Sequence, residues 1–132
     1  MKYKLTDETK ELYDKTLYRI ECIDAFSNVK AGDSGGWVEF EGNLSQFGDA
    51  WVSDDAWVSD NAQVSDNAVV RGDAEVRDNA RVSGDAVVRG NAEVSGNAKV
   101  SGDAVVRGNA EVSGNAVVSK TYDMMVIGPV GS

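Results

Sequence analysis

From Val52 to Val118 the chain repeats a pattern of six residues: Val, then Ser or Arg, then Gly or Asp, then Asp or Asn, then Ala and a variable residue. Ala and the next Val stand two positions apart, so their side chains share one side of an extended strand. The intervening Gly, Asp and Asn accept positive φ or hydrogen-bond their own backbone. Each copy therefore predicts a short strand with an apolar inner side, followed by a corner.

The variable residues sort into three sets when they are read at steps of eighteen positions. The sets are Trp51, Val69, Val87 and Val105; Trp57, Glu75, Glu93 and Glu111; and Gln63, Arg81, Lys99 and Val117. We name the three outward surfaces that these sets define the first, second and third face. One repeat cannot bury its apolar side alone and must stack on its neighbours. The pattern predicts an all-β triangular solenoid of about four coils with 18 residues each.

This spacing, with Val at the aliphatic position and Ala four residues later, resembles the repeat of hexapeptide-repeat left-handed β-helix proteins. The resemblance implies a left-handed parallel β-helix, whereas periodicity alone says nothing about handedness. Three segments are similar to the entry into the repeats in a group of uncharacterised bacterial and phage proteins, some of which carry an acetyltransferase label. These segments are Val29–Val38, Asn43–Gln46 and Gly48–Val52. The resemblance covers residues 3 to about 118 and implies a phage-type or bacterial protein without an assigned activity.

The non-repeating ends suggest three parts: an N-terminal cap at 1–48, the solenoid at 49–119 and a C-terminal strand or tail at 120–132. In the cap we expect strands at 3–5, 16–23 and 37–40, with a short helix at 6–13 as an alternative. We expect an aromatic cluster to cover the first coil, and an aromatic ligand pocket is the alternative. This cluster comprises Trp37, Phe40, Phe47 and Trp57.

The tail carries a short apolar run, residues 124–127, which is the candidate for closing the last coil. It also looks like the beginning of a further strand-rich segment in phage relatives, which leaves open whether the chain is truncated.

Charge and composition narrow the classes of partner. A net charge of −9 over 132 residues makes direct nucleic-acid binding unfavourable, because a phosphate backbone requires a basic surface. It leaves a basic protein partner open. No segment has the length of a membrane span or the apolar core of a signal peptide, so we expect a cytoplasmic protein, in the host cytoplasm if it is phage-encoded. The single Cys22 excludes an internal disulfide and predicts a buried thiol.

The chain contains no histidine, so the two enzyme classes that its motifs suggest lack their usual general base. Residues 32–36 spell Gly-Asp-Ser-Gly-Gly, as at the nucleophile of trypsin-like proteases, but Ser34 has no histidine base to activate it. Hexapeptide-repeat acyltransferases likewise depend on a histidine that deprotonates the acceptor. The corner Asp and Asn residues lack the period and spelling of calcium-binding solenoids. We therefore predict a non-catalytic protein without cofactor or metal.

The first face is the main candidate for an interface, because Trp51, Val69, Val87 and Val105 form an outward apolar column. The resemblance implies a homotrimer in which different faces of neighbouring subunits pack together. Arg71, Arg89 and Arg107 stand beside this column. They either pair with Glu75, Glu93 and Glu111 in their own coils or form a contact for an anion or an acidic partner.

The sequence thus predicts an assembly or binding module. Two alternatives stay open: a protein that sequesters a ligand or inhibits a host factor, including an acidic mimic of nucleic acid, and an orphan acyltransferase.

Overall fold

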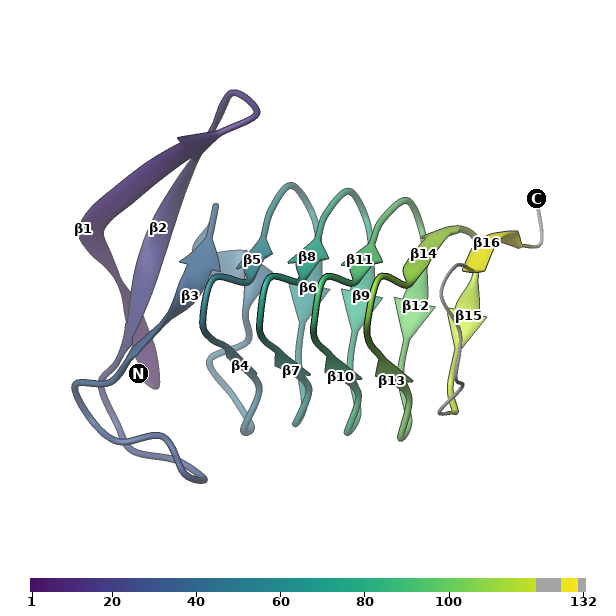
Figure 1. Cartoon of the computed structure of the whole chain (residues 1–132). Helices are drawn as coiled ribbons and strands as arrows, with labels where there is room; N and C mark the ends of the chain where they lie inside the picture. Colours follow the sequence, from purple (N-terminus) through teal and green to yellow (C-terminus); the bar gives the residue numbers. More distant parts are fainter. Residues whose placement is uncertain (121–126, 131–132) are drawn as a thin grey trace.

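The computed structural model describes residues 1–120 and 127–130. Its strands stack as parallel coils into a β-solenoid, with a long hairpin at the N-terminal end (Figure 1). The prediction of an all-β solenoid is confirmed. Within the described ranges the helical structure is one short 3-10 turn, η1 (Glu41–Asn43), and no helix is long and apolar enough to cross a membrane.

The repeat strands form three parallel stacks, one on each face. The first face contains β4 (Trp51–Val52), β7 (Val69–Val70), β10 (Val87–Val88) and β13 (Val105–Val106). The second face contains β5 (Trp57–Val58), β8 (Glu75–Val76), β11 (Glu93–Val94) and β14 (Glu111–Gly114). The third face contains β6 (Gln63–Val64), β9 (Arg81–Val82), β12 (Lys99–Val100) and β15 (Val117–Val118). Val69 pairs with Val87, and Val87 pairs with Val105. Residues eighteen positions apart therefore lie side by side, and the three sets of variable residues are stacked columns.

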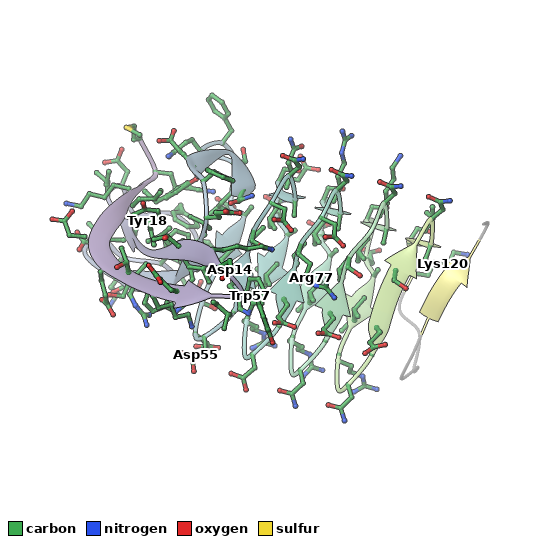
Figure 2. The ribbon with its side chains drawn as sticks, turned by 90° about the horizontal axis from the view of Figure 1, so that it is seen from above. Asp14, Tyr18, Asp55, Trp57, Arg77 and Lys120 are labelled. Atoms are coloured by element: carbon green, nitrogen blue, oxygen red, sulfur yellow. The ribbon has the colours of Figure 1, made fainter. Side chains whose placement is uncertain are left out.

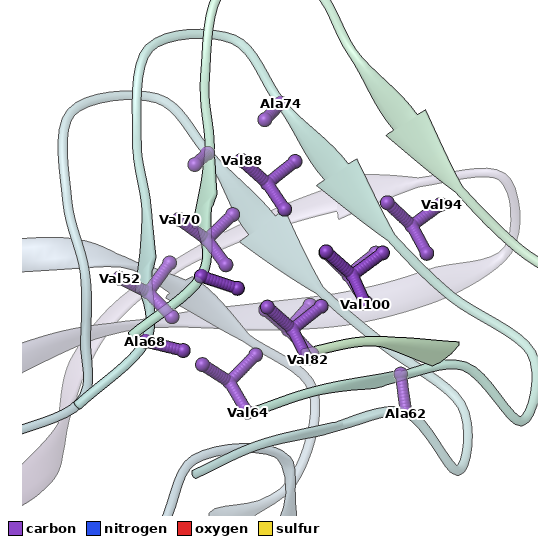
Figure 3. Packing of buried hydrophobic residues seen from close by; sticks show 14 of the residues in the cluster. Val52, Ala62, Val64, Ala68, Val70, Ala74, Val82, Val88, Val94 and Val100 are labelled. Atoms are coloured by element: carbon purple, nitrogen blue, oxygen red, sulfur yellow. The ribbon is translucent and has the colours of Figure 1, made fainter. Parts of the chain in front are cut away.

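The inner side of the solenoid is filled by the Val and Ala residues of the repeat, none of which is more than 2% exposed. Figure 3 shows Val52, Val70 and Val88 following one another along the interior. Burying a valine side chain stabilises the fold by about 1.5 kcal/mol or more. Because each coil presents the same side chains, the methyl groups of one coil contact those of the next without a change in backbone shape.

The corners, which also stack in three columns, require a backbone with positive φ, provided by Asp at positions 54, 60, 66 and 78 and by Gly at the others. Asp54 (φ 59) lies below Gly72 (φ 70) and Gly90 (φ 69) in one such column. A Cβ on Gly72 would lie 3.0 Å from the amide nitrogen of Gly90, so glycine allows the coils to approach closely. Asp54 uses its carboxylate instead to accept a hydrogen bond from the Gly72 amide at 3.1 Å.

The cap contains a hairpin of β1 (Tyr3–Leu12) and β2 (Lys15–Cys22), which pair antiparallel. The alternative of a helix at 6–13 is wrong, because this polar segment forms most of β1. The two residues at the tip, Tyr13 and Asp14, have φ of 52° and 64°. Two consecutive positive φ angles are typical of the tight turns that match the twist of a hairpin. Polar side chains are compatible with β1 because it is the outermost strand of its sheet.

Strand β3 (Ser34–Val38) connects the hairpin to the solenoid, since it is antiparallel to β2 and parallel to β5. Leu44 forms a bridge with Val64 in the same parallel sense. Parallel stacking therefore starts before the hexapeptide pattern does. A Cβ on Gly36 would lie 2.6 Å from the carbonyl oxygen of Ala56, so this close approach accounts for a glycine in the Gly-Asp-Ser-Gly-Gly segment.

At the other end, β16 (Ile127–Val130) pairs with β14 through Val112 and Ile127 and through Gly114 and Val130. The predicted closing segment at 124–127 lies outside the described residues except for Ile127. The buried thiol is confirmed, since Cys22 is free and 1% exposed.

Candidate functional site

The first face carries the predicted apolar column in register, from Trp51 through Val69 and Val87 to Val105. The three valines are half-buried, so each keeps part of its side chain at the surface. Trp51 is only 6% exposed. Its ring contacts Phe26 edge-on, with 5.3 Å between the ring centroids. Trp51 therefore holds the cap in place and offers little surface to a partner, whereas the valines remain accessible.

A groove of about 400 Å³ lies on this face, beside residues 26–29 of the cap. It is lined by Phe26, Ser27, Asn28, Val29, Asp49, Trp51, Ser53, Asp54, Val69, Arg71 and Val87. Its floor is apolar, and its charged lining residues are Asp49, Asp54 and Arg71. The structure thus brings Trp51, Val69 and Val87 together with Arg71, as expected from their positions in the repeat.

The arginines lie where the repeat predicts, but the ion pairs that they could form within one coil are not seen in two of the coils. Arg71 lines the first-face groove, and Arg89 and Arg107 follow it on successive coils. Among the described residues, no ion pair joins Arg71 to Glu75 or Arg89 to Glu93. Pairing within one coil is therefore not observed in these two coils.

The second face contains a separate cavity of about 310 Å³ between the hairpin tip and the solenoid. Its lining residues are Tyr13, Lys15, Trp57, Glu75, Arg77 and Glu93. Trp57, Glu75 and Glu93 are consecutive members of one column. Figure 2 shows Asp14 at the tip of the hairpin beside Trp57, with Arg77 on the next coil. The cavity therefore has a solenoid floor and a wall contributed by the cap.

The carboxylates of Glu75 and Glu93 dominate the electrostatics of this cavity. Burial raises the pKa of Glu75 to about 7, and the neighbouring Glu93 carboxylate contributes in the same direction. Arg77 and a hydrogen bond from the Trp57 side chain oppose this shift. The pKa of Glu93 is lowered, chiefly because it hydrogen-bonds Glu75. At neutral pH the two carboxylates therefore share a proton for part of the time.

Lys15 closes one side of the cavity. Its Nζ donates to Asp60 Oδ2 at 2.8 Å and to Ser59 Oγ at 3.2 Å. The same ammonium lies 5.8 Å from the centre of the Trp57 ring, within the range of a cation–π contact. The Lys15 hydrogen bond, opposed by burial, lowers the pKa of Asp60. Lys15 thus fixes the base of the hairpin tip to the solenoid.

The predicted aromatic cluster is only half formed. Trp37 pairs in register with Trp57, and both pack with Leu17. Phe40 and Phe47 are 54% and 85% exposed, so their assignment to the cluster is wrong. Phe40 immediately precedes η1 and Phe47 lies in the following loop, beyond the strands that align the two tryptophans.

Sequence reasoning assigned no role to Tyr13, Lys15 or Arg77. The column that contains Trp57, Glu75 and Glu93 could be read from the repeat, and it was the available signal for this site. The position of the hairpin tip above the column could not be read in the same way, because it depends on how the non-repeating cap folds back onto the first coil.

Comparison with protein-family models and with curated proteins finds no match for this chain. Within the described part of the chain, no three His, Cys, Asp or Glu side chains are placed to hold a metal ion together.

Proposed function

We propose that this protein is a non-catalytic assembly module that forms a homotrimer through its first face. The observation that carries the proposal is the first-face groove, whose apolar floor of Val69 and Val87 continues to Val105. An outward apolar surface of this kind on a small protein is typical of an interface. The repeat resembles that of left-handed β-helices, which commonly assemble in this way, and we propose left-handed winding on the same ground.

The third face is the proposed counterpart of the groove. It carries Arg81 and Lys99 in register, followed by Val117, which is 66% exposed. The groove contains Asp49 and Asp54 beside its apolar floor. Apolar surfaces therefore face each other when the first face of one copy packs on the third face of the next, and Asp49 and Asp54 offer carboxylates to Arg81 and Lys99, while Arg71 in the groove adds a like charge. Such a heterologous contact closes into a ring by threefold rotation.

Light scattering on the purified protein at micromolar concentration tests this proposal. The wild type is expected to have the mass of a trimer, and Val87→Lys is expected to be monomeric, because it places a charge in the apolar floor. Glu111→Lys is the matched control, since it introduces the same side chain on the second face and is expected to remain trimeric. A monomeric wild type contradicts the proposal, as does an unchanged mass for Val87→Lys with a native circular dichroism spectrum.

A further inference from the structure

The second-face cavity has an aromatic wall that requires an explanation beyond folding. Trp57 is 4% exposed and forms the base of this wall, but Tyr13 is 75% exposed at the hairpin tip. Their ring centroids lie 6.2 Å apart at an angle of 39°. An aromatic side chain on an exposed two-residue turn is not needed for the turn, which favours Asn, Asp or Gly. Tyr13 instead extends the aromatic surface of Trp57 along the wall of the cavity.

The floor beside this wall is negatively charged, and the cationic side chains around it do not fully neutralise this charge. Glu75 and Glu93 lie directly opposite each other on adjacent parallel strands, where like charges are unfavourable. They are accompanied by the ring of Trp57 on β5, Arg77 after β8, and Tyr13 and Lys15 from the hairpin. Glu111 follows Glu93 in the column and hydrogen-bonds it.

The two cationic groups of the cavity are already engaged by other carboxylates. Lys15 forms its ion pair with Asp60 at 2.8 Å. Arg77 Nη1 lies 3.8 Å from Asp78 Oδ2. Lys15 is thus balanced by an acid outside the Glu75–Glu93 pair, and Arg77 divides its charge between Asp78 and that pair. A proton on that pair supplies the positive charge that the side chains lack, and the cavity leaves room for a larger cation to replace it.

We propose that the second-face cavity binds a small organic cation, with its ammonium or guanidinium group against the carboxylates of Glu75 and Glu93 and beside the Trp57 ring. The carboxylates accept hydrogen bonds from the cation, and the ring contributes a cation–π contact. Tyr13 covers the aliphatic part of the ligand. The cavity volume of about 310 Å³ is at the small end of ligand sites, which suits a short amine or guanidine. The inference is independent of self-association, because the proposed trimer leaves the second face free.

Calorimetric titration with agmatine, which carries a guanidinium and an ammonium group, tests the site. At pH 8 we expect a dissociation constant of about 0.1 to 1 mM from one cation–π contact and one charge-assisted hydrogen bond. Glu93→Gln is expected to weaken binding about tenfold or more, because it removes one carboxylate of the pair. Glu41→Gln is the matched control, because it removes the same charge in η1 and does not line the cavity, and it is expected to change the affinity less than about twofold.

Two further readouts separate a built site from general attraction to an acidic protein. Tyr13→Asn keeps a residue suited to the positive φ of the turn and is expected to weaken agmatine binding without loss of folded structure. Binding is expected to release protons at pH 7, so the measured heat depends on the buffer and the affinity rises between pH 5.5 and 8 as the Glu75–Glu93 proton leaves.

The proposal is overturned if agmatine gives no saturable heat up to about 10 mM, far above the expected constant. It is also overturned if Glu93→Gln and Glu41→Gln weaken binding equally, or if the affinity does not rise with pH. An acetylated and amidated Gly-Arg-Gly peptide distinguishes the source of the cation. Binding of agmatine alone assigns the site to a free small molecule, and tighter Glu93-dependent binding of the peptide assigns it to an arginine of a basic protein.

Discussion

Substitution of Gly90 at a corner tests the stacking of coils most directly. Gly90→Ala is expected to lower the free energy of unfolding by about 2 to 3 kcal/mol. The backbone of Gly90 has φ +69, which costs a residue with a side chain about 1 kcal/mol. Its Cβ would lie 2.9 Å from the Gly108 amide nitrogen, and relief of this overlap costs about a further 1 to 2 kcal/mol.

Gly90→Asp is expected to cost less than Gly90→Ala, although it adds a larger side chain. Asp54 occupies an equivalent corner and accepts a hydrogen bond from Gly72 at 3.1 Å. A hydrogen bond to a charged group contributes about 1.5 kcal/mol or more, and Asp tolerates the left-handed region better than Ala does. The difference between the two variants is therefore expected to be about 1 to 2 kcal/mol in favour of Asp.

Urea unfolding followed by circular dichroism measures both variants. Gly42→Ala is the control, because nothing lies within 4 Å of the added Cβ and its φ is not positive, and it should stay within about 0.5 kcal/mol of the wild type. The reasoning is refuted if Gly90→Ala is as stable as the wild type, or if Gly90→Asp is no more stable than Gly90→Ala.

Two more predictions concern polar groups that are partly or fully buried. The pKa of Glu75 is raised to about 7, so the Glu75 carboxyl holds its proton more tightly in the folded protein than in the unfolded chain. This difference stabilises the fold below about pH 4.5, and the stabilisation is lost as the pH rises through 7. After allowance for partial exposure and the opposite shift of Glu93, about 1 kcal/mol should disappear between pH 5 and 8. Thermal melts should show a flatter pH profile in Glu75→Gln, and an unchanged profile would contradict this cause. Burial raises the pKa of Tyr3, whose hydroxyl lies 2.6 Å from the Leu44 carbonyl oxygen and 2.7 Å from that of Glu41. Tyr3→Phe should therefore lower the free energy of unfolding in urea by about 1 to 2 kcal/mol, whereas a neutral result would show that water replaces the hydroxyl.

The repeat by itself determined the solenoid and the three columns, because both follow from local spacing. A strand alternates its side chains, and a coil that repeats its sequence repeats its backbone. Val87 could therefore be placed next to Val69 and Val105 without coordinates. The same logic placed Trp57, Glu75 and Glu93 in one column.

The tertiary structure alone decided what the cap does to these columns. Tyr13 contacts Trp57, and Phe26 contacts Trp51. Tyr13 and Phe26 belong to the cap, whose sequence has no periodicity from which these contacts could be predicted. The polar composition of residues 6–13 suited a helix as well as a strand, and pairing with β2 selected the strand. Local spacing cannot encode such a choice, because the free energy that makes it comes from long-range pairing and burial. The cavity above Glu75 and Glu93 therefore emerged only once the hairpin was placed on the solenoid.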